Sequence, residues 1–173
     1  TRIGSSAASD VYKRQAVDNA PAMIAQAREQ LSDPRARFEC ADLTEFAVTD
    51  AKVVVLNFVM QFLPPAARLP LLQRLRSQMR SDGLLIVSEK THQSDADVQK
   101  FYDSTHLAWK RANGYSELEV SQKRQSLEQV MIVDSEEIHN QRFSDAGFAH
   151  SQTWFRCMNW ASFLVEPERP QQQ

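Results

Sequence analysis

Glycine and cysteine are both scarce in this sequence, which has four glycines and two cysteines among 173 residues. Cys40 and Cys157 lack the paired spacing of a metal site, and a chain of this length does not need a disulfide framework, so we expect two reduced thiols. No run approaches the roughly 18 consecutive apolar residues that a membrane span requires. Together these absences favour a cytoplasmic protein.

An excess of charge of one sign is also missing. The chain carries 20 basic and 22 acidic residues, for a formal net charge of -2, and 42% of its residues are hydrophobic. Tight nucleic-acid binding usually requires a basic surface, so this balance argues against a direct nucleic-acid partner. The length and the hydrophobic share suit one soluble domain with its own core.

The apolar pattern after residue 15 alternates between strand and helix. Helical spacing follows Pro21, with Asn19 as the expected N-cap, and a second helix follows Pro64 and should end at Ser-Asp-Gly (81–83). The β-branched run at 53–56 is typical of a strand buried on both faces of a parallel sheet. Further strands are expected at 16–17, 35–43 and 84–90. This β-α-β-β-α-β order predicts a doubly wound α/β sheet.

After the last of these strands the pattern changes. Residues 95–146 are predicted to be mostly helical, and 150–165 is typical of two adjacent strands that turn near Asn159. Residues 167–173 form a polar tail. The first fifteen residues show no apolar periodicity, and we interpret them as a non-native leader before a domain at 16–166.

Polar residues follow three of the predicted strands, at the edge where open α/β sheets bind ligands. Asp18 could accept hydrogen bonds from both hydroxyls of a ribose, or could be favoured there by the positive end of the next helix. Asp42, with Leu43, could face an adenine ring, or could be an exposed turn aspartate. Asn57 is expected to have a backbone or ligand partner, because a buried unsatisfied amide costs about 1–3 kcal/mol.

The densest polar stretch, 110–124 (KRANGYSELEVSQKR), contains four cations and a Ser116–Glu119 capping-box pattern. It is either a helix corner with solvated charges or a site where an arginine binds an anion, since a guanidinium matches a carboxylate in bidentate fashion. Glu89 is either functional or paired with Lys90. The four histidines lack metal-ligand spacing, so we expect no metal.

Several of these segments together resemble one family. They are DNAPAM (18–23), VVVLNFVMQFLPP (53–65), LIVSEK (85–90), KRANGYSELEVSQKR (110–124), LEQVM (127–131) and the AGF…WF ending. From about Ala16 to Val165 the chain resembles the bacterial carboxy-S-adenosyl-L-methionine synthases. The fold that this implies is the class I methyltransferase fold, a Rossmann-like sheet with a C-terminal antiparallel hairpin.

The resemblance also implies an activity. Members of this family convert S-adenosyl-L-methionine and prephenate to carboxy-S-adenosyl-L-methionine and phenylpyruvate, as a sulfonium ylide captures the released carbon dioxide. A separate enzyme uses the product to modify the wobble uridine of tRNA. The family forms homodimers, so the implied partners are a second copy and these small molecules, without direct nucleic-acid or membrane binding.

The resemblance gives cofactor-binding roles to six positions and assigns no catalytic residue. The roles are the ribose for Asp18 and Asn19, the adenine for Asp42 and Leu43, the amino-acid end of the cofactor for Asn57, and the added carboxylate for Arg124.

The family's first strand, first helix and glycine-rich loop have no counterpart in this sequence. We therefore expect a methyltransferase sheet that lacks its first strand and helix, and the scarcity of glycine agrees with that interpretation. Two other functions stay open. One is an ordinary S-adenosyl-L-methionine-dependent methyltransferase, and the other is a catalytically silent dimer partner whose helices at 95–146 serve dimerisation.

We predict that the 173-residue chain by itself is poorly soluble, is inactive, and binds S-adenosyl-L-methionine weakly or not at all. A sheet without its first strand leaves neighbouring strands without ladder partners and uncovers apolar surface. Isothermal titration calorimetry measures the affinity, and binding in the micromolar range would contradict the prediction.

Overall fold

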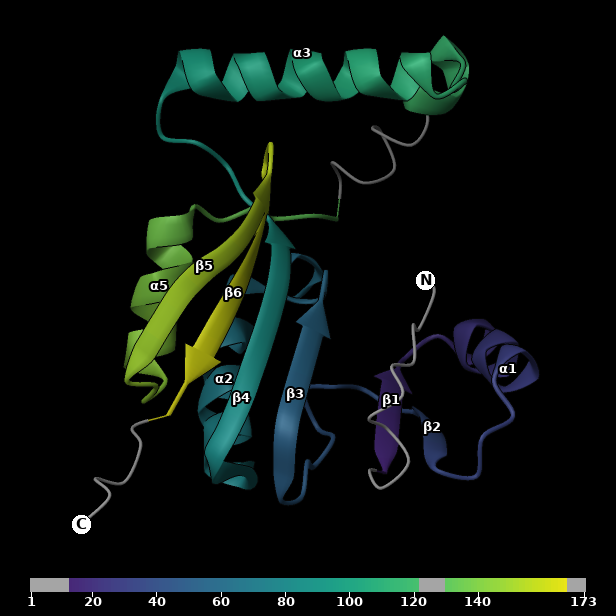
Figure 1. Cartoon of the computed structure of the whole chain (residues 1–173), viewed down its shortest axis with the longest axis vertical. Helices are drawn as coiled ribbons and strands as arrows, with labels where there is room; N and C mark the ends of the chain where they lie inside the picture. Colours follow the sequence, from purple (N-terminus) through teal and green to yellow (C-terminus); the bar gives the residue numbers. More distant parts are fainter. Residues whose placement is uncertain (1–12, 122–129, 168–173) are drawn as a thin grey trace. The chain divides into compact units, whose positions relative to one another are not determined.

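The computed structural model describes residues 13–121 and 130–167 (Figure 1). The chain divides into two compact units, Thr1–Ala47 and Val48–Gln173, and each unit has its own sheet. Among the described residues, no helix is both long enough and apolar enough to cross a membrane.

The first unit is a strand–helix–strand arrangement. It consists of β1 (Arg14–Asp18), α1 (Pro21–Gln30) and β2 (Ala36–Cys40). The strands pair in parallel, with Asp18 opposite Cys40 at their carboxyl ends. Parallel neighbours need a crossover connection, usually a helix, and α1 supplies it as the sequence predicted. β1 begins two residues before the expected strand at 16–17.

The start of α1 differs from the prediction. Its N-cap is Ala20 rather than Asn19, and no side chain caps this helix. The reason is local, because Asp18 Oδ1 accepts a hydrogen bond from the Ala20 N–H at 2.8 Å and so shapes the turn before the helix. Within this fully described helix, Ile24 alone is buried.

The second unit contains a four-stranded sheet in the order β3-β4-β6-β5. β3 and β4 are parallel, whereas β6 pairs antiparallel with both β4 and β5. The predicted C-terminal hairpin is confirmed, and it turns at 158–159. The elements are β3 (Ala51–Asn57), the 3-10 helix η2 (Met60–Phe62), α2 (Pro65–Gln78), β4 (Met79–Lys90), α3 (Ala96–Ala112), α5 (Glu136–Asp145), β5 (His150–Cys157) and β6 (Trp160–Glu166).

The core of this unit lies between its sheet and the helices α2 and α5, which contact each other (Figure 1). The ring of Phe163 on β6 lies 5.5 Å from that of Phe143 and 5.4 Å from that of His139, both on α5. On α2 the buried side chains are Arg68, Leu71, Leu72 and Leu75. Their spacing is that of one helix face.

Two predictions about the strands are wrong. β3 is not buried on both faces, because Val53 and Val55, which point to the same face of the sheet, are 53% and 57% exposed. The tripeptide at 81–83 does not end the second helix, which stops at Gln78, but lies within β4. At Gly83 a Cβ would lie 3.0 Å from a backbone oxygen of the same strand, so only glycine fits without a shift.

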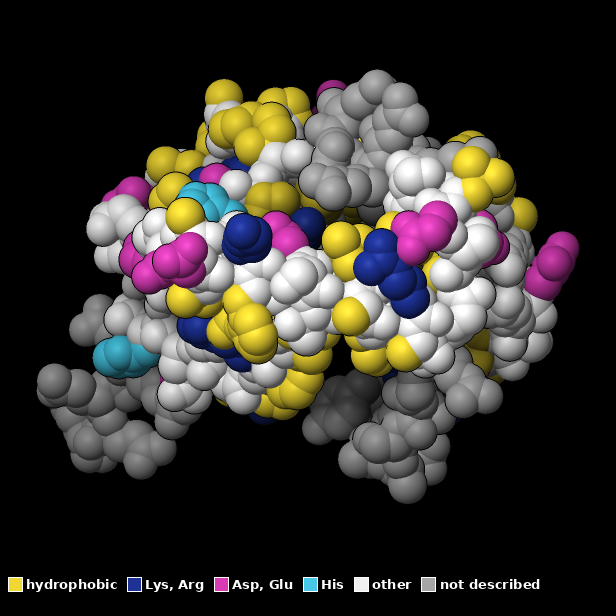
Figure 2. Space-filling model, turned by 90° about the horizontal axis from the view of Figure 1, so that it is seen from above, with side chains coloured by type: hydrophobic (Ala, Val, Ile, Leu, Met, Phe, Trp, Pro, Cys, Tyr) yellow, Lys and Arg dark blue, Asp and Glu magenta, His cyan; other side chains and the backbone are white. Residues whose placement is uncertain are grey.

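α3 contains no buried residue along its described length. Its aromatic side chains Phe101 and Trp109 are 63% and 55% exposed. Figure 2, which views the molecule from above, shows hydrophobic side chains at the surface among charged ones. α3 therefore does not cover a core among the described residues, although the ring of the half-buried His106 lies 4.5 Å from that of Trp160 on β6.

We predict that Phe163→Ala lowers the free energy of unfolding of the second unit by about 3–5 kcal/mol, since it opens a cavity in the core. Phe155→Ala on the neighbouring strand is the matched control, because that ring is 56% exposed and its loss should cost less than about 1 kcal/mol. Urea unfolding followed by tryptophan fluorescence measures both. Equal losses for the two variants would contradict this core.

Candidate functional site

Four of the predicted cofactor-binding residues lie together at one edge of the first unit. Asp18 ends β1 and Asn19 follows it, while Asp42 and Leu43 come just after β2. Because the two strands are parallel and in register, their carboxyl ends meet at the same edge. The Ala41 N–H donates to the Asp18 backbone oxygen at 3.2 Å and ties the two strand ends together.

The Asp18 side chain is half-buried and held in place. Its Oδ1 accepts the hydrogen bond from the Ala20 N–H at 2.8 Å. A carboxylate offers about four acceptor positions, so this single bond leaves capacity for hydroxyl donors. Asn19 is exposed, and its backbone oxygen lies 4.0 Å from the Cys40 sulfur.

Asp42 lies in a turn rather than at the end of the strand, since β2 stops at Cys40. The carboxylate is exposed, and its Oδ1 accepts hydrogen bonds from the Thr44 N–H and hydroxyl, both at 2.7 Å. This is the self-contained turn that aspartate commonly forms. Leu43, in the same turn, is half-buried.

Asn57 belongs to the second unit and ends β3, opposite Ser88 in the parallel ladder. The expected burial is wrong, because its side chain is exposed. Asn57 points to the same face of β3 as the exposed Val53 and Val55. The next residue, Phe58, has a φ of 57°, a left-handed conformation that costs about 1–3 kcal/mol for such a residue.

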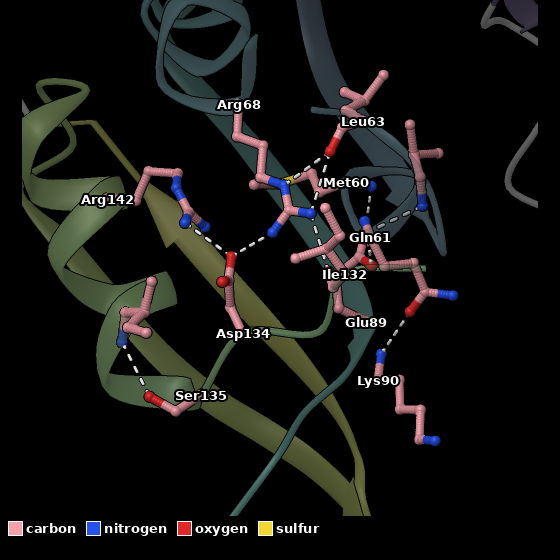
Figure 3. Close-up of polar contacts among 12 residues, drawn as sticks. Met60, Gln61, Leu63, Arg68, Glu89, Lys90, Ile132, Asp134, Ser135 and Arg142 are labelled. Carbon is pink, nitrogen blue, oxygen red and sulfur yellow. Dashed lines mark hydrogen bonds and ion pairs between the residues drawn. The ribbon is translucent and has the colours of Figure 1, made fainter. Parts of the chain in front are cut away.

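Glu89, at the end of β4, lies beside this turn and is completely buried. Its Oε1 accepts hydrogen bonds from the Val59 and Met60 N–H groups at 3.0 and 2.8 Å, and its Oε2 accepts one from Gln61 at 3.2 Å (Figure 3). The start of a helix leaves such N–H groups without partners. The Glu89 carboxylate thus caps η2 instead of pairing with Lys90.

Burial raises the pKa of Glu89 to about 7, because the three N–H donors and the nearby Arg68 lower it by less than desolvation raises it. His139 shows the opposite effect. Burial, helped by the charge of Arg142, lowers the pKa of His139 to about 4. Both groups therefore favour their neutral forms.

A second buried charge, Arg68 of α2, supports the same loop (Figure 3). Its guanidinium donates to the Leu63 backbone oxygen at 3.1 Å and to the Ile132 backbone oxygen at 2.9 Å, and it forms an ion pair with Asp134. Arg142 of α5 donates to the same Asp134 oxygen at 2.7 Å. Burial opposes the shift, but Arg142 and Arg68 together lower the pKa of Asp134.

Arg124, the predicted carboxylate-binding residue, lies outside the described residues. The described part of the 110–124 stretch contains the predicted capping box. The Ser116 N–H donates to Glu119 at 2.8 Å, and the Glu119 N–H donates to the Ser116 hydroxyl at 3.2 Å. Arg111 forms an exposed ion pair with Glu117.

Metal ligands do not gather in the part of the chain that the structure describes. Within 13–121 and 130–167 there is no group of three or more histidine, cysteine, aspartate or glutamate side chains that could hold a metal ion. Cys40 and Cys157 are both exposed free thiols.

Comparison with known proteins shows which proteins the chain is similar to. Residues 3–83 match the model of a methyltransferase domain. Over 155 residues the chain is 49% identical to the carboxy-S-adenosyl-L-methionine synthase of Geobacter metallireducens and 47% identical to that of Geobacter sp. (strain M21). The chain is therefore similar to the carboxy-S-adenosyl-L-methionine synthases. Each match covers 87% of this chain and 64% of the relative, so the chain spans just under two thirds of the relatives' length.

The solved structures agree at the level of the fold. Human N-acetylserotonin methyltransferase, solved in complex with S-adenosylmethionine, superposes with a TM-score of 0.61 at 16% identity, over 90% of this chain and 40% of that chain. At this identity the likeness concerns the fold alone. It agrees with a mixed α/β, methyltransferase-like architecture that ends in an antiparallel hairpin.

Sequence reasoning missed Arg68 and left the role of Glu89 open. Arg68 precedes Leu71 and Leu72 by three and four residues, so its place on the buried helix face could have been found from spacing. Glu89 gave no comparable signal, because its partners are 28 to 30 residues away in the sequence.

We predict opposite pH effects from two buried groups. Between pH 4.5 and about 7 the native state holds the Glu89 proton more tightly than the unfolded state, so this group makes stability fall as pH rises, by about 3 kcal/mol in all. Between about pH 4 and 6.5 the native state binds a proton at His139 less readily, so that group makes stability rise with pH by a similar amount.

In each single variant, the pH dependence of the free energy of unfolding should therefore be set by the group that remains. In Glu89→Gln the free energy of unfolding should rise from pH 4.5 to 6.5, and in His139→Gln it should fall. The three tryptophans, Trp109, Trp154 and Trp160, all belong to the second unit, so urea unfolding followed by their fluorescence measures it. Parallel pH profiles for the two variants would refute the assignment.

Proposed function

We propose that this chain provides the nucleoside-binding part of a carboxy-S-adenosyl-L-methionine synthase. The observation that carries the proposal is the position of Asp18, Asn19, Asp42 and Leu43 at the carboxyl edge of the β1–β2 pair, the edge at which open α/β sheets bind ligands. The identity of 49% to a synthase of this activity supports it.

At this edge Asp18 and Asn19 receive the ribose hydroxyls of S-adenosyl-L-methionine. A carboxylate suits two neighbouring hydroxyls because it accepts from both, and the bond to Ala20 keeps Asp18 oriented. Asp42 and Leu43 take the adenine, whose amino group needs an acceptor. Asn57, exposed at the end of β3, contributes to the amino-acid end.

The proposed reaction moves a carboxyl group rather than a methyl group. Prephenate loses carbon dioxide and hydroxide as it becomes phenylpyruvate, and the sulfonium methyl group loses a proton that leaves with the hydroxide as water. The resulting ylide carbon forms a bond to the carbon dioxide. Arg124 pairs with the new carboxylate, because a guanidinium binds a carboxylate through two parallel hydrogen bonds.

The partners follow from the same family. We propose a cytoplasmic homodimer, whose product passes to a separate enzyme that modifies the wobble uridine of tRNA. The net charge of -2 suits a protein that handles small molecules and does not itself bind the tRNA.

The alternative is an ordinary S-adenosyl-L-methionine-dependent methyltransferase. The methyltransferase-domain match over residues 3–83 favours it, since that match does not distinguish the two reactions. A catalytically silent dimer partner is the third candidate, and α3, which has no buried residue, is the feature that favours it.

The next prediction concerns a chimera. The part of the Geobacter metallireducens relative that precedes the matched region is joined to this chain at Ala16. With S-adenosyl-L-methionine and prephenate the chimera should form a product heavier than the cofactor by one carboxyl group, detected by mass spectrometry. Formation of S-adenosylhomocysteine with a methyl acceptor would favour the ordinary methyltransferase instead.

Arg124→Ala in the same chimera should abolish most of the preference for carboxy-S-adenosyl-L-methionine over S-adenosyl-L-methionine. We expect a loss of at least about tenfold, as for a charged hydrogen-bonded pair. Arg111→Ala is the matched control, since Arg111 lies in the same stretch and pairs with Glu117 at the surface. An unchanged preference and an unchanged rate in Arg124→Ala would contradict the role of Arg124, and a chimera that shows no turnover would favour the silent partner.

A further inference from the structure

We propose that Glu89 is a positioning residue, whose carboxylate clamps the backbone after Phe58 and thereby holds Asn57 at the carboxyl edge of the sheet. The inference rests on the proposed function, because it assigns a task to the neighbourhood of Asn57, one of the proposed cofactor residues. It adds a residue that does not touch the cofactor itself but acts through Asn57.

The clamp is built from three consecutive N–H groups and one buried side chain. Val59 and Met60 donate to one carboxylate oxygen and Gln61 to the other, at 2.8 to 3.2 Å. No side chain of the loop itself caps η2. The negative charge at the start of this 3-10 helix therefore comes from the neighbouring strand β4, which is rigid because it is paired on both sides.

The turn that the clamp follows is strained. Phe58 has a φ of 57°, and a bulky residue keeps such a conformation only where its surroundings hold it. Two neighbours on β4 do so. The Ser88 backbone oxygen accepts from the Phe58 N–H at 2.8 Å, and Glu89 binds the next three N–H groups. Asn57 directly precedes this turn, so its backbone direction depends on both contacts.

The same loop is also fastened to the chain segment after Arg124. The Ile132 N–H donates to the Gln61 backbone oxygen at 2.9 Å, and Arg68 donates to the Ile132 backbone oxygen at 2.9 Å. Ile132 comes eight residues after Arg124 in the sequence. Glu89 thus holds a loop that directly follows Asn57 and that also contacts Ile132, eight residues after Arg124.

The strength of the clamp depends on its protonation. An ionised carboxylate only accepts hydrogen bonds, whereas a protonated one must also donate, and every partner of Glu89 here is itself a donor. Arg68 of α2 faces this group and favours its ionised form. Lys90 is the next residue on β4. Asp134 forms ion pairs with both Arg68 and Arg142, and His139 lies on α5 beside Phe163. The clamp is therefore tighter above the pKa of Glu89.

The test compares wild type, Glu89→Gln and Asp82→Asn in the chimera described above. Glutamine has nearly the same shape, but its amide nitrogen would face a backbone N–H donor. Asp82 is the matched control, because it is an exposed carboxylate at the opposite end of the same strand. Two readouts are needed: calorimetric S-adenosyl-L-methionine affinity between about pH 6 and pH 8, and amide hydrogen exchange.

We expect Glu89→Gln to weaken cofactor binding about tenfold at pH 8. Wild-type affinity should rise from pH 6 to pH 8, whereas that of Glu89→Gln should stay flat. Exchange should accelerate at Val59, Met60 and Gln61, but not in the centre of β4. Asp82→Asn should match wild type in every measurement, because its side chain lies far along the strand from the clamp.

Failure of the positioning role and failure of the proposed function give different results. If wild type binds S-adenosyl-L-methionine and Glu89→Gln binds it equally well with the same pH profile, the positioning role is wrong and the proposed function survives. The role is also wrong if exchange accelerates equally throughout β4 and β6, since that pattern indicates a general loss of stability. If wild type does not bind the cofactor, the proposed function fails, and this inference fails with it.

Discussion

The structure of the second unit depends on the hydrogen bonds that one buried carboxylate accepts. Glu89 has no exposed surface, and an unsatisfied charge in such a place would be very costly. Three backbone N–H groups of the loop at 59–61 satisfy it. In return, the loop gains the cap that its own sequence does not provide, and the strained turn at Phe58 is held in place. Strand, loop and turn therefore stabilise one another.

Arg68 extends this arrangement with the opposite charge. It is also fully buried, and it joins α2 to the loop and to the segment at 130–134 through backbone oxygens and Asp134. Buried ion pairs often contribute little net stability, because desolvation offsets their attraction, but losing one partner is costly. We interpret Arg68 and Glu89 as groups that select one geometry for the loop after β3. That loop is next to Asn57, where the proposed function needs a defined backbone.

The order of elements was predictable because hydrophobic periodicity is a local property. The parallel βαβ arrangements and the hairpin at 150–166 follow directly from it. Burial was less predictable. The run at 53–56 has the composition of a strand covered on both faces, yet Val53 and Val55 on one of its faces are exposed. The mistaken burial of Asn57 has the same cause, since the exposure of a side chain depends on what packs over its face of the sheet and not on the residue itself.

The sequence alone showed the resemblance to the carboxy-S-adenosyl-L-methionine synthases, through motifs such as 110–124 and 53–65, and it determined features whose partners are close in the chain. The capping box of Ser116 and Glu119 is one example, with partners three residues apart. Only the tertiary structure decided what Glu89 and Arg68 do. Their partners lie up to 30 and 66 residues away, and a hydrogen bond between such positions exists only after the strands and helices have packed. Charge and spacing in a sequence identify candidates, but folding selects which donor meets which acceptor.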